Sequence, residues 1–160
     1  MMEAGVPRVF VLNGSNLNML GIREPGIYGT QTLEDIRVLV MRRAEELKIE
    51  VDFRQTNHEG VLIDSIHEAH AGADGIIINA GGFTRTSVSI LDALKAVAKP
   101  WIELHMANTY RRESYRGTSI MTHGADAIVA GFGGYGYVMA LDGILDLIAK
   151  KDRGEQIRYS

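Results

Sequence analysis

Short apolar runs alternate with amphipathic stretches along the whole chain. Each apolar run ends in polar or turn residues, which is typical of buried parallel strands. The expected strands are 8–12, 51–55, 75–79, 100–104 and 127–130, the second with the alternation of an edge strand. Between them, apolar residues recur at helical spacing. This spacing predicts helices over 33–47, about 62–69, about 84–98 and 137 to about 150.

Strands that alternate with helices predict a parallel sheet with helices on both faces. Five strands in 160 residues indicate a flavodoxin-like, doubly wound α/β fold, with one domain over 1–160. The stretch of about 18–30 is too long for a tight connection, and we expect it to be an active-site lid. The charged end of the chain, from about 152, is expected to fray.

Composition narrows the classes of function. The net charge of −3 provides no basic patch, so we expect no nucleic-acid partner. The absence of cysteine excludes disulfides, thiolate chemistry and a Cys-based zinc site, and we expect neither metal nor cofactor. Because the sequence contains neither a secretory signal pattern nor an apolar run of membrane-spanning length, we expect a cytoplasmic protein without membrane contact.

Polar side chains follow three of the expected strands. Asn13 and Asn16 follow the first, Asn79 lies at the end of the third and His105 follows the fourth. The carboxyl ends of parallel strands meet at one edge of the sheet, where ligands bind in open α/β folds. Glu103 lies two residues before His105, hence on the same face of the strand, and can hold the imidazole in one tautomer.

The expected lid carries Arg23 and Tyr28. A tyrosine is a poor base, but a guanidinium nearby favours the phenolate. With Tyr28 on one side of a pocket and His105 on the other, the residues suit elimination next to a carbonyl group. An ordinary exposed loop tyrosine is the alternative interpretation.

Three further sequence patterns are weaker indicators of function. Residues 131–136 fit G-x-G-x-x-G, but they precede the last helix rather than the first, so a tight turn is the better interpretation than a dinucleotide site. His67 and His70 are three apart, not the four of the zinc-protease motif, and suit a solvated helix face. The arginines of 111–116 suit either a small anion or a solvated loop.

Several separate motifs occur together in a familiar order. They are 12–18 (LNGSNLN), 23–25 (REP), 27–29 (IYG), 55–60 (QTNHEG), 78–79 (IN), 86–88 (TSV), 92–94 (DAL), 103–105 (ELH), and Arg112-Glu113 with Arg116. With these motifs the chain resembles the type II 3-dehydroquinate dehydratases over most of its length, from the first strand to the last helix.

The resemblance implies a flavodoxin-like fold, self-association as a dodecamer of four trimers, and a small-molecule substrate. It implies a hydro-lyase that converts 3-dehydroquinate to 3-dehydroshikimate through an enolate, without a cofactor. This step belongs both to the shikimate pathway of aromatic amino acid biosynthesis and to quinate breakdown.

The resemblance also implies roles in proton transfer. Tyr28 would be the base that removes the C2 proton, and Arg23 would favour its phenolate form. His105 would protonate the departing C1 hydroxyl, and Glu103 would orient it.

The substrate-reading residues follow in the same way. Asn16 and Asn79 would hold the substrate and the water that stabilises the enolate. Arg116 would bind a substrate hydroxyl, and Asp92 would reach in from a neighbouring subunit. The backbone at 106–107 (Met106 and Ala107) would receive the substrate carboxylate.

The chain departs from the family pattern within the expected pocket. Ser15 stands where the family usually has Pro, 83–85 (FTR) where it has Tyr-Thr-His, and Ala107 where it has Ser. Arg85 either reaches the substrate carboxylate itself or selects a different ligand. The alternatives are therefore a related enzyme for another 3-oxo cyclitol acid or β-hydroxy ketone, and a non-catalytic ligand-binding module. The acid–base pair argues against the second alternative.

Overall fold

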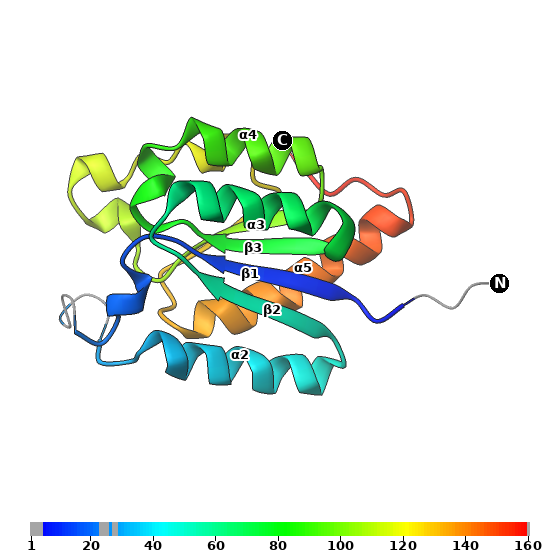
Figure 1. The fold of residues 1–160 in the computed structure, drawn as a ribbon, viewed down its shortest axis with the longest axis horizontal. Helices are drawn as coiled ribbons and strands as arrows, with labels where there is room; N and C mark the ends of the chain where they lie inside the picture. The colour runs from blue at the N-terminus through cyan, green and yellow to red at the C-terminus, as the bar shows by residue number, and fades with distance from the viewer. Residues whose placement is uncertain (1–4, 23–25, 27–28, 160) are drawn as a thin grey trace.

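The five strands form one parallel sheet, in the order β2-β1-β3-β4-β5 (Figure 1). The computed structural model describes residues 5–22, 26 and 29–159. The strands are β1 (Arg8–Asn13), β2 (Glu50–Gln55), β3 (Gly75–Asn79), β4 (Trp101–His105) and β5 (Ala127–Ala130). This order is that of flavodoxin-like sheets, so the predicted doubly wound α/β fold is confirmed.

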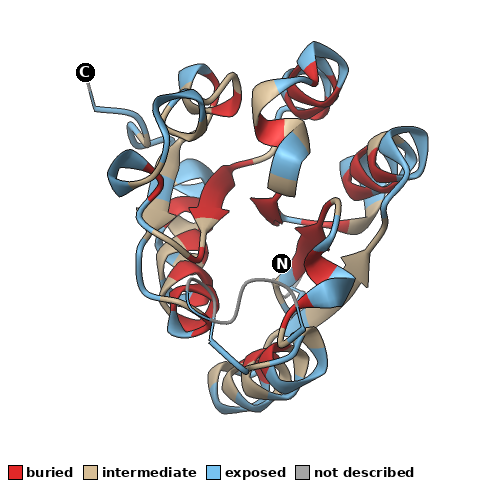
Figure 2. Cartoon of the chain, turned by 90° about the vertical axis from the view of Figure 1, so that its left-hand side faces the viewer, coloured by how far each residue is buried: buried red, intermediate tan, exposed pale blue. Residues whose placement is uncertain are grey.

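Helices cover both faces of the sheet. On one face lie α2 (Leu33–Leu47) and α5 (Tyr135–Asp152), and on the other α3 (Glu59–Gly72) and α4 (Val88–Val97). Each face has its own apolar core, and neighbouring residues of a strand point into opposite cores: Ile77 lies in one and Ile78 in the other. Figure 2 shows the buried residues on the strands and on the inward sides of the helices.

Local sequence signals set several element boundaries. The Thr32 hydroxyl accepts from the Asp35 N–H while the Asp35 carboxylate accepts from the Thr32 N–H, a capping box that starts α2. The Ser87 hydroxyl caps α4 by accepting from Ile90 N–H. The predicted edge position of β2 is confirmed, and its residues are half-buried or exposed.

Some boundaries differ from the sequence expectation. α3 begins at Glu59 and α5 at Tyr135, two or three residues earlier than predicted. A 3-10 turn, η2 (Gly81–Arg85), occupies the start of the helix expected from about residue 84. The other 3-10 turns are η1 (Leu17–Met19), η3 (Thr109–Arg111), η4 (Ser114–Arg116) and η5 (Met121–His123).

The direction of the strand order reverses between β1 and β3. The connection after β1 leads to β2 on one side, and the connection after β3 leads to β4 on the other, which opens a crevice at the carboxyl edge. Gly14 lets the two loops meet there: its N–H donates to the Asn79 carbonyl at 2.7 Å. A Cβ at residue 14 would lie 2.2 Å from the Ala80 carbonyl oxygen, so only glycine fits.

Two further predictions concern the lid at about 18–30 and the tail from about 152. Arg23 and Tyr28 of the lid lie outside the described residues. The flanks of that segment meet, because a Cβ on Gly21 would lie 2.9 Å from the Thr30 carbonyl oxygen. At the other end, α5 runs to Asp152, and Arg158 pairs with Asp126 at 2.5 Å. Among the helices that the structure describes, none combines the length and apolar character needed to cross a bilayer.

Candidate active site

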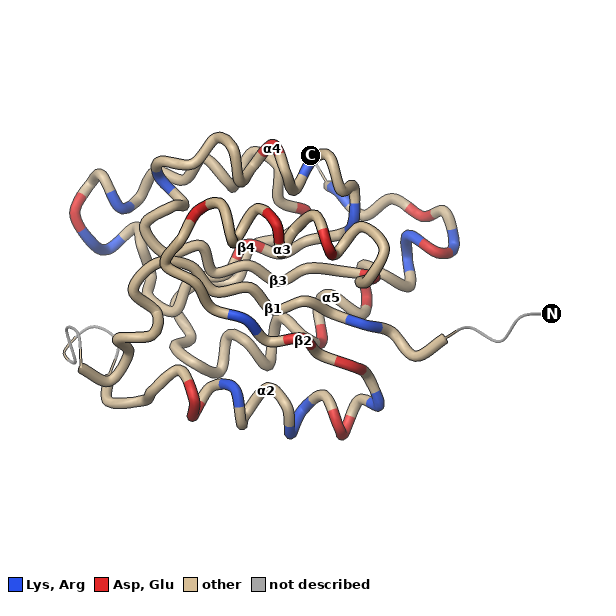
Figure 3. Tube along the Cα trace, viewed as in Figure 1, with Lys and Arg blue, Asp and Glu red and all other residues tan. Residues whose placement is uncertain are grey.

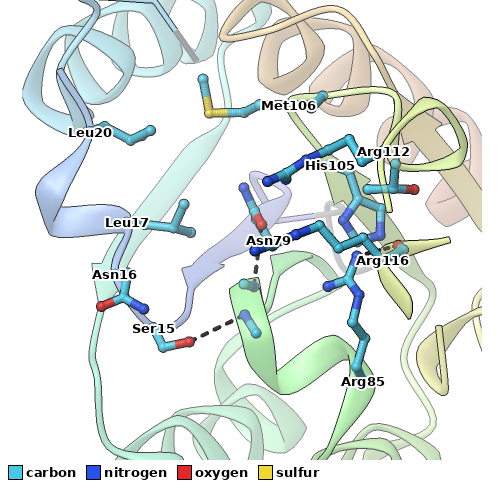
Figure 4. Close-up of a pocket in the computed structure, with 14 residues that line it drawn as sticks. Ser15, Asn16, Leu17, Leu20, Asn79, Arg85, His105, Met106, Arg112 and Arg116 are labelled. Atoms are coloured by element: carbon cyan, nitrogen blue, oxygen red, sulfur yellow. Dashed lines mark hydrogen bonds between the residues drawn. The ribbon is translucent and has the colours of Figure 1, made fainter. Parts of the chain in front are cut away.

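A cavity of about 100 Å³ opens at the carboxyl ends of β1, β3 and β4, beside the reversal of the strand order (Figure 4). Its lining comes from three loops that are far apart in sequence. The lining residues are Ser15, Asn16, Leu17, Leu20, Asn79, Gly81, Gly82, Arg85, His105, Met106, Ala107, Thr109, Arg112 and Arg116. Seven of the predicted site residues are among them: Asn16, Asn79, Arg85, His105, Met106, Ala107 and Arg116.

Glu103 lies beneath the cavity and holds His105. Its Oε2 is 2.5 Å from His105 Nε2, and its side chain is almost fully buried. The Ser119 and Thr122 hydroxyls each donate to this carboxylate at 2.7 Å. Burial alone would raise the pKa of Glu103, but the hydrogen bonds from His105, Ser119 and Thr122 outweigh it and hold that pKa below its ordinary value. A fixed carboxylate on Nε2 leaves Nδ1 of the imidazole for a ligand.

Asn79 is held in one orientation by a buried tyrosine. The Tyr137 hydroxyl accepts from Asn79 Nδ2 at 2.9 Å and donates to Asn13 Oδ1 at 2.6 Å. Asn13 Nδ2 in turn donates to the Arg54 carbonyl at 2.9 Å. Asn13, Asn79 and Tyr137 are all buried, and burial raises the pKa of Tyr137 far above its ordinary value, so its hydroxyl stays protonated. Because both amides are fixed, Asn79 presents a defined polar edge to the cavity.

Three guanidinium groups form one wall of the cavity. Arg85 comes from η2, Arg112 follows η3 and Arg116 ends η4, and Figure 4 shows them together beside His105. Arg112 and Arg116 belong to a loop whose charged residues stand out in Figure 3. Arg116 also pairs with Glu113 at 3.1 Å. Such a wall suits an anionic or hydroxyl-rich ligand.

The opposite wall comes from the loop after β1. The Ser15 hydroxyl accepts from the Gly82 N–H at 3.2 Å, which joins this loop to η2 (Figure 4). Asn16 has a left-handed backbone, and its N–H donates to Asn57 Oδ1 at 2.9 Å. Proline, usual in the family at position 15, has no hydroxyl to make the first of these bonds. The departure at Ser15 therefore adds a contact between the two loops that frame the cavity.

One predicted site residue lies elsewhere on the chain. Asp92 is exposed on α4 and does not line the cavity. The sequence interpretation also missed residues that matter to the geometry. Arg112 belongs to the basic loop and to one of the family motifs, but the sequence assigned it no role in the site. Ser119, Thr122 and Tyr137 give no signal of their own, since they resemble ordinary loop or core residues.

The glycine turn predicted between the last strand and helix supports the end of β4. Gly131 N–H donates to the His105 carbonyl at 3.2 Å, and Gly133 N–H donates to the Met106 carbonyl at 2.9 Å. These two hydrogen bonds fix the backbone at His105 and Met106 and so help to position the His105 imidazole. Within residues 5–22, 26 and 29–159, no three His, Cys, Asp or Glu side chains gather as a metal site would require.

Comparison with known proteins identifies the family of the chain. The family model described as "Dehydroquinase class II" matches residues 7–145. A protein of Dinoroseobacter shibae named 3-dehydroquinate dehydratase is 52% identical over 136 residues, 85% of this chain and 91% of that protein. One of Rhizobium johnstonii with the same name is 47% identical over 141 residues, 88% and 97% of the two chains.

A solved structure supports the same relationship. The type II dehydroquinase from Butyrivibrio crossotus superposes with a TM-score of 0.86 at 40% identity, over 88% of this chain and 98% of that one. The chain is a flavodoxin-like α/β protein with a polar pocket at the carboxyl edge of its sheet. It belongs to the class II dehydroquinase family. The family expected from the sequence motifs is confirmed.

Proposed function

We propose that the chain catalyses the dehydration of 3-dehydroquinate to 3-dehydroshikimate, with Tyr28 as base and His105 as acid. The observation that carries the proposal is the hydrogen bond between the buried Glu103 and the partly exposed His105, at the floor of a pocket with an arginine wall. The 3-dehydroquinate dehydratases of Dinoroseobacter and Rhizobium, together with the family motifs, support the choice of substrate.

In the proposed mechanism two proton transfers are assigned to Tyr28 and His105. Tyr28 as phenolate, favoured by Arg23, takes the C2 proton, and the electron pair of that C–H bond passes into the neighbouring carbonyl to form an enolate. The enolate then collapses, the C1–C2 double bond forms, and the C1–O bond breaks. His105 gives its Nδ1 proton to the departing hydroxyl, which leaves as water, while Glu103 stabilises the imidazolium through Nε2.

The flanks of the lid support the assignment of Tyr28. Gly21 and Thr30 meet at the base of the segment, next to Leu20 of the pocket lining. The segment that contains Tyr28 therefore starts beside the cavity lining, which supports a role for Tyr28 at this site.

The arginine wall of the cavity and the two asparagines, Asn16 and Asn79, would bind the substrate. Asn16 and Asn79 would hold substrate hydroxyls and the water that stabilises the enolate, and Arg116 would bind a hydroxyl. The backbone at 106–107 (Met106 and Ala107) would receive the carboxylate. The family's serine is Ala107 here, so one hydroxyl donor is missing at that point.

The ultraviolet absorbance of the conjugated product tests the proposal. Protein mixed with 3-dehydroquinate should give a rising signal, and Tyr28→Phe should lower kcat at least about 100-fold while the fold survives. Tyr159→Phe, the same change at an exposed tyrosine, is the matched control and should leave the rate unchanged. A flat trace from folded wild-type protein would contradict the choice of substrate and direct the search to other β-hydroxy ketones.

We also propose that Asp92 acts in the site of a second copy, within a trimer-based dodecamer. Asp92 is exposed on α4 outside its own cavity, and the exposed Val88 lies one turn before it on the same helix face. Co-expression of Asp92→Asn and Tyr28→Phe chains tests this, since a mixed assembly would contain some sites with both residues intact. Turnover no higher than the sum of the two parents would contradict it.

A further inference from the structure

Arg85 lies in the cavity wall but bonds to the backbone of another loop. Its Nε donates to the Tyr115 carbonyl at 3.1 Å, and its Nη2 donates to the Arg116 carbonyl. Both carbonyls belong to η4, about thirty residues further along the chain. Figure 4 shows the Arg85 side chain extending toward Arg116.

The loop that receives these bonds has little packing of its own. Its 3-10 turns are closed by backbone hydrogen bonds between residues three apart, from Arg112 N–H to the Thr109 carbonyl and from Gly117 N–H to the Ser114 carbonyl. Its two tyrosines, Tyr110 and Tyr115, are 72% and 60% exposed and so contribute little buried area. A loop of this kind opens readily unless side chains from the body of the protein hold it.

We propose that Arg85 is a positioning residue that clamps the turn 114–116, so that Arg112 and Arg116 face the cavity before a ligand arrives. Hydrogen bonds from a charged donor are stronger than neutral ones, and the rigid fork of a guanidinium can engage two neighbouring carbonyls together. Imidazole, the usual group at this position in the family, cannot offer that fork. The clamp thus explains how the pocket accommodates the substitution.

The clamp has a consequence for binding. A ligand that meets a preordered pair of arginines does not have to order the loop, so it binds more tightly than it would to an open loop. The clamp acts on ligand binding, whereas proton transfer depends on Tyr28 and His105. This part of the inference rests on the proposed function, because it assumes that 3-dehydroquinate is the ligand.

Limited trypsin digestion without ligand tests the clamp directly. Trypsin cleaves after arginine, and the loop offers Arg111, Arg112 and Arg116 as sites. Arg85→Ala should raise the cleavage rate at these sites about tenfold, since two charge-assisted bonds at a partly exposed position are lost. Arg85→Lys should restore only part of the protection. Arg37→Ala removes a hydrogen-bonded arginine from α2, far from the loop, and should leave the rate unchanged.

Steady-state kinetics of the same variants give a second readout. Arg85→Ala should raise KM for 3-dehydroquinate about tenfold and change kcat less than about threefold. A raised KM with unchanged cleavage would overturn the clamp and assign Arg85 to direct ligand contact. Unchanged cleavage and KM would also overturn it, and faster cleavage with unchanged KM would refute its role in binding. If wild-type protein fails to turn over 3-dehydroquinate, the proposed function fails, but the digestion still decides whether the clamp exists.

Discussion

Replacing Tyr137 by Phe removes one oxygen atom from the interior and leaves two amides without their partner. The hydroxyl lies between Asn13 Oδ1, to which it donates at 2.6 Å, and Asn79 Nδ2, from which it accepts at 2.9 Å. The exposed fractions of Asn13, Asn79 and Tyr137 are 0%, 5% and 1%, so bulk water does not reach the freed groups. We therefore expect a loss of stability and of the fixed Asn79 orientation.

The magnitude follows from counting the freed groups. One acceptor on Asn13 and one N–H on Asn79 lose their partner, and each buried unsatisfied group costs about 1–3 kcal/mol. The variant no longer buries a hydroxyl, which offsets part of the loss, so the expected net cost is about 2–4 kcal/mol. For a chain of this size the midpoint of thermal unfolding falls about 2–4 °C per kcal/mol, which gives a drop of about 5–15 °C.

Thermal unfolding followed by circular dichroism provides the measurement, at one fixed protein concentration for all variants. Tyr135→Phe is the matched control: it makes the same change two residues earlier in α5, at a tyrosine that is 60% exposed, and should shift the midpoint by less than about 2 °C. If Tyr137→Phe unfolds within 2 °C of the wild type, roughly the control's limit, the hydroxyl makes no net contribution and the reasoning is wrong.

Two further predictions, tested with three variants, concern other parts of the structure. Ionised Glu103 stabilises the fold above its ordinary pKa of 4.5, and this contribution is lost as pH falls through its lowered folded-state pKa. Glu103→Gln should therefore unfold at lower urea concentration than wild type at pH 7, by a margin that shrinks below about pH 4.5; a constant margin would contradict this. Gly14→Ala should cost about 3 kcal/mol or more against the Ala80 carbonyl, whereas Gly60→Ala, in open space at the start of α3, should gain up to about 1 kcal/mol; equal thermal midpoints would refute the packing argument.

Much of the fold could be predicted because each element carries a local signal. The run 75–79 is apolar and bounded by Gly and Asn, and it forms a strand that is buried throughout. The start of α3 could not be predicted in the same way. Gly60 and the turn-like 57–60 stretch conceal a helix that begins at Glu59, because glycine has a low helix propensity and the exposed first turn precedes the apolar repeat that starts at Leu62.

In the site, too, contacts within one strand could be predicted and contacts between distant segments could not. Glu103 and His105 could be paired because residues two apart on a strand share a face. The hydroxyls of Ser119 and Thr122, 16 and 19 residues further on, could not be assigned to that carboxylate, since no periodicity links a strand to a distant turn. The direction of the Arg85 side chain could not be predicted either, because it depends on the 3-10 turn η2, which carries this residue.

The pocket is assembled from the ends of separate strands. This origin determines what regained ligand binding reports when the protein is refolded. Asn16 follows β1, whereas Asn79 and His105 are the last residues of β3 and β4. These strands pair with one another only after long stretches of chain have been brought together. Non-local parallel pairing is slow, and no single supersecondary unit contains all three groups. A partly folded chain with native helices would still lack the pocket. Regained ligand binding therefore reports cooperative completion of the central sheet, whereas helical signal can return earlier.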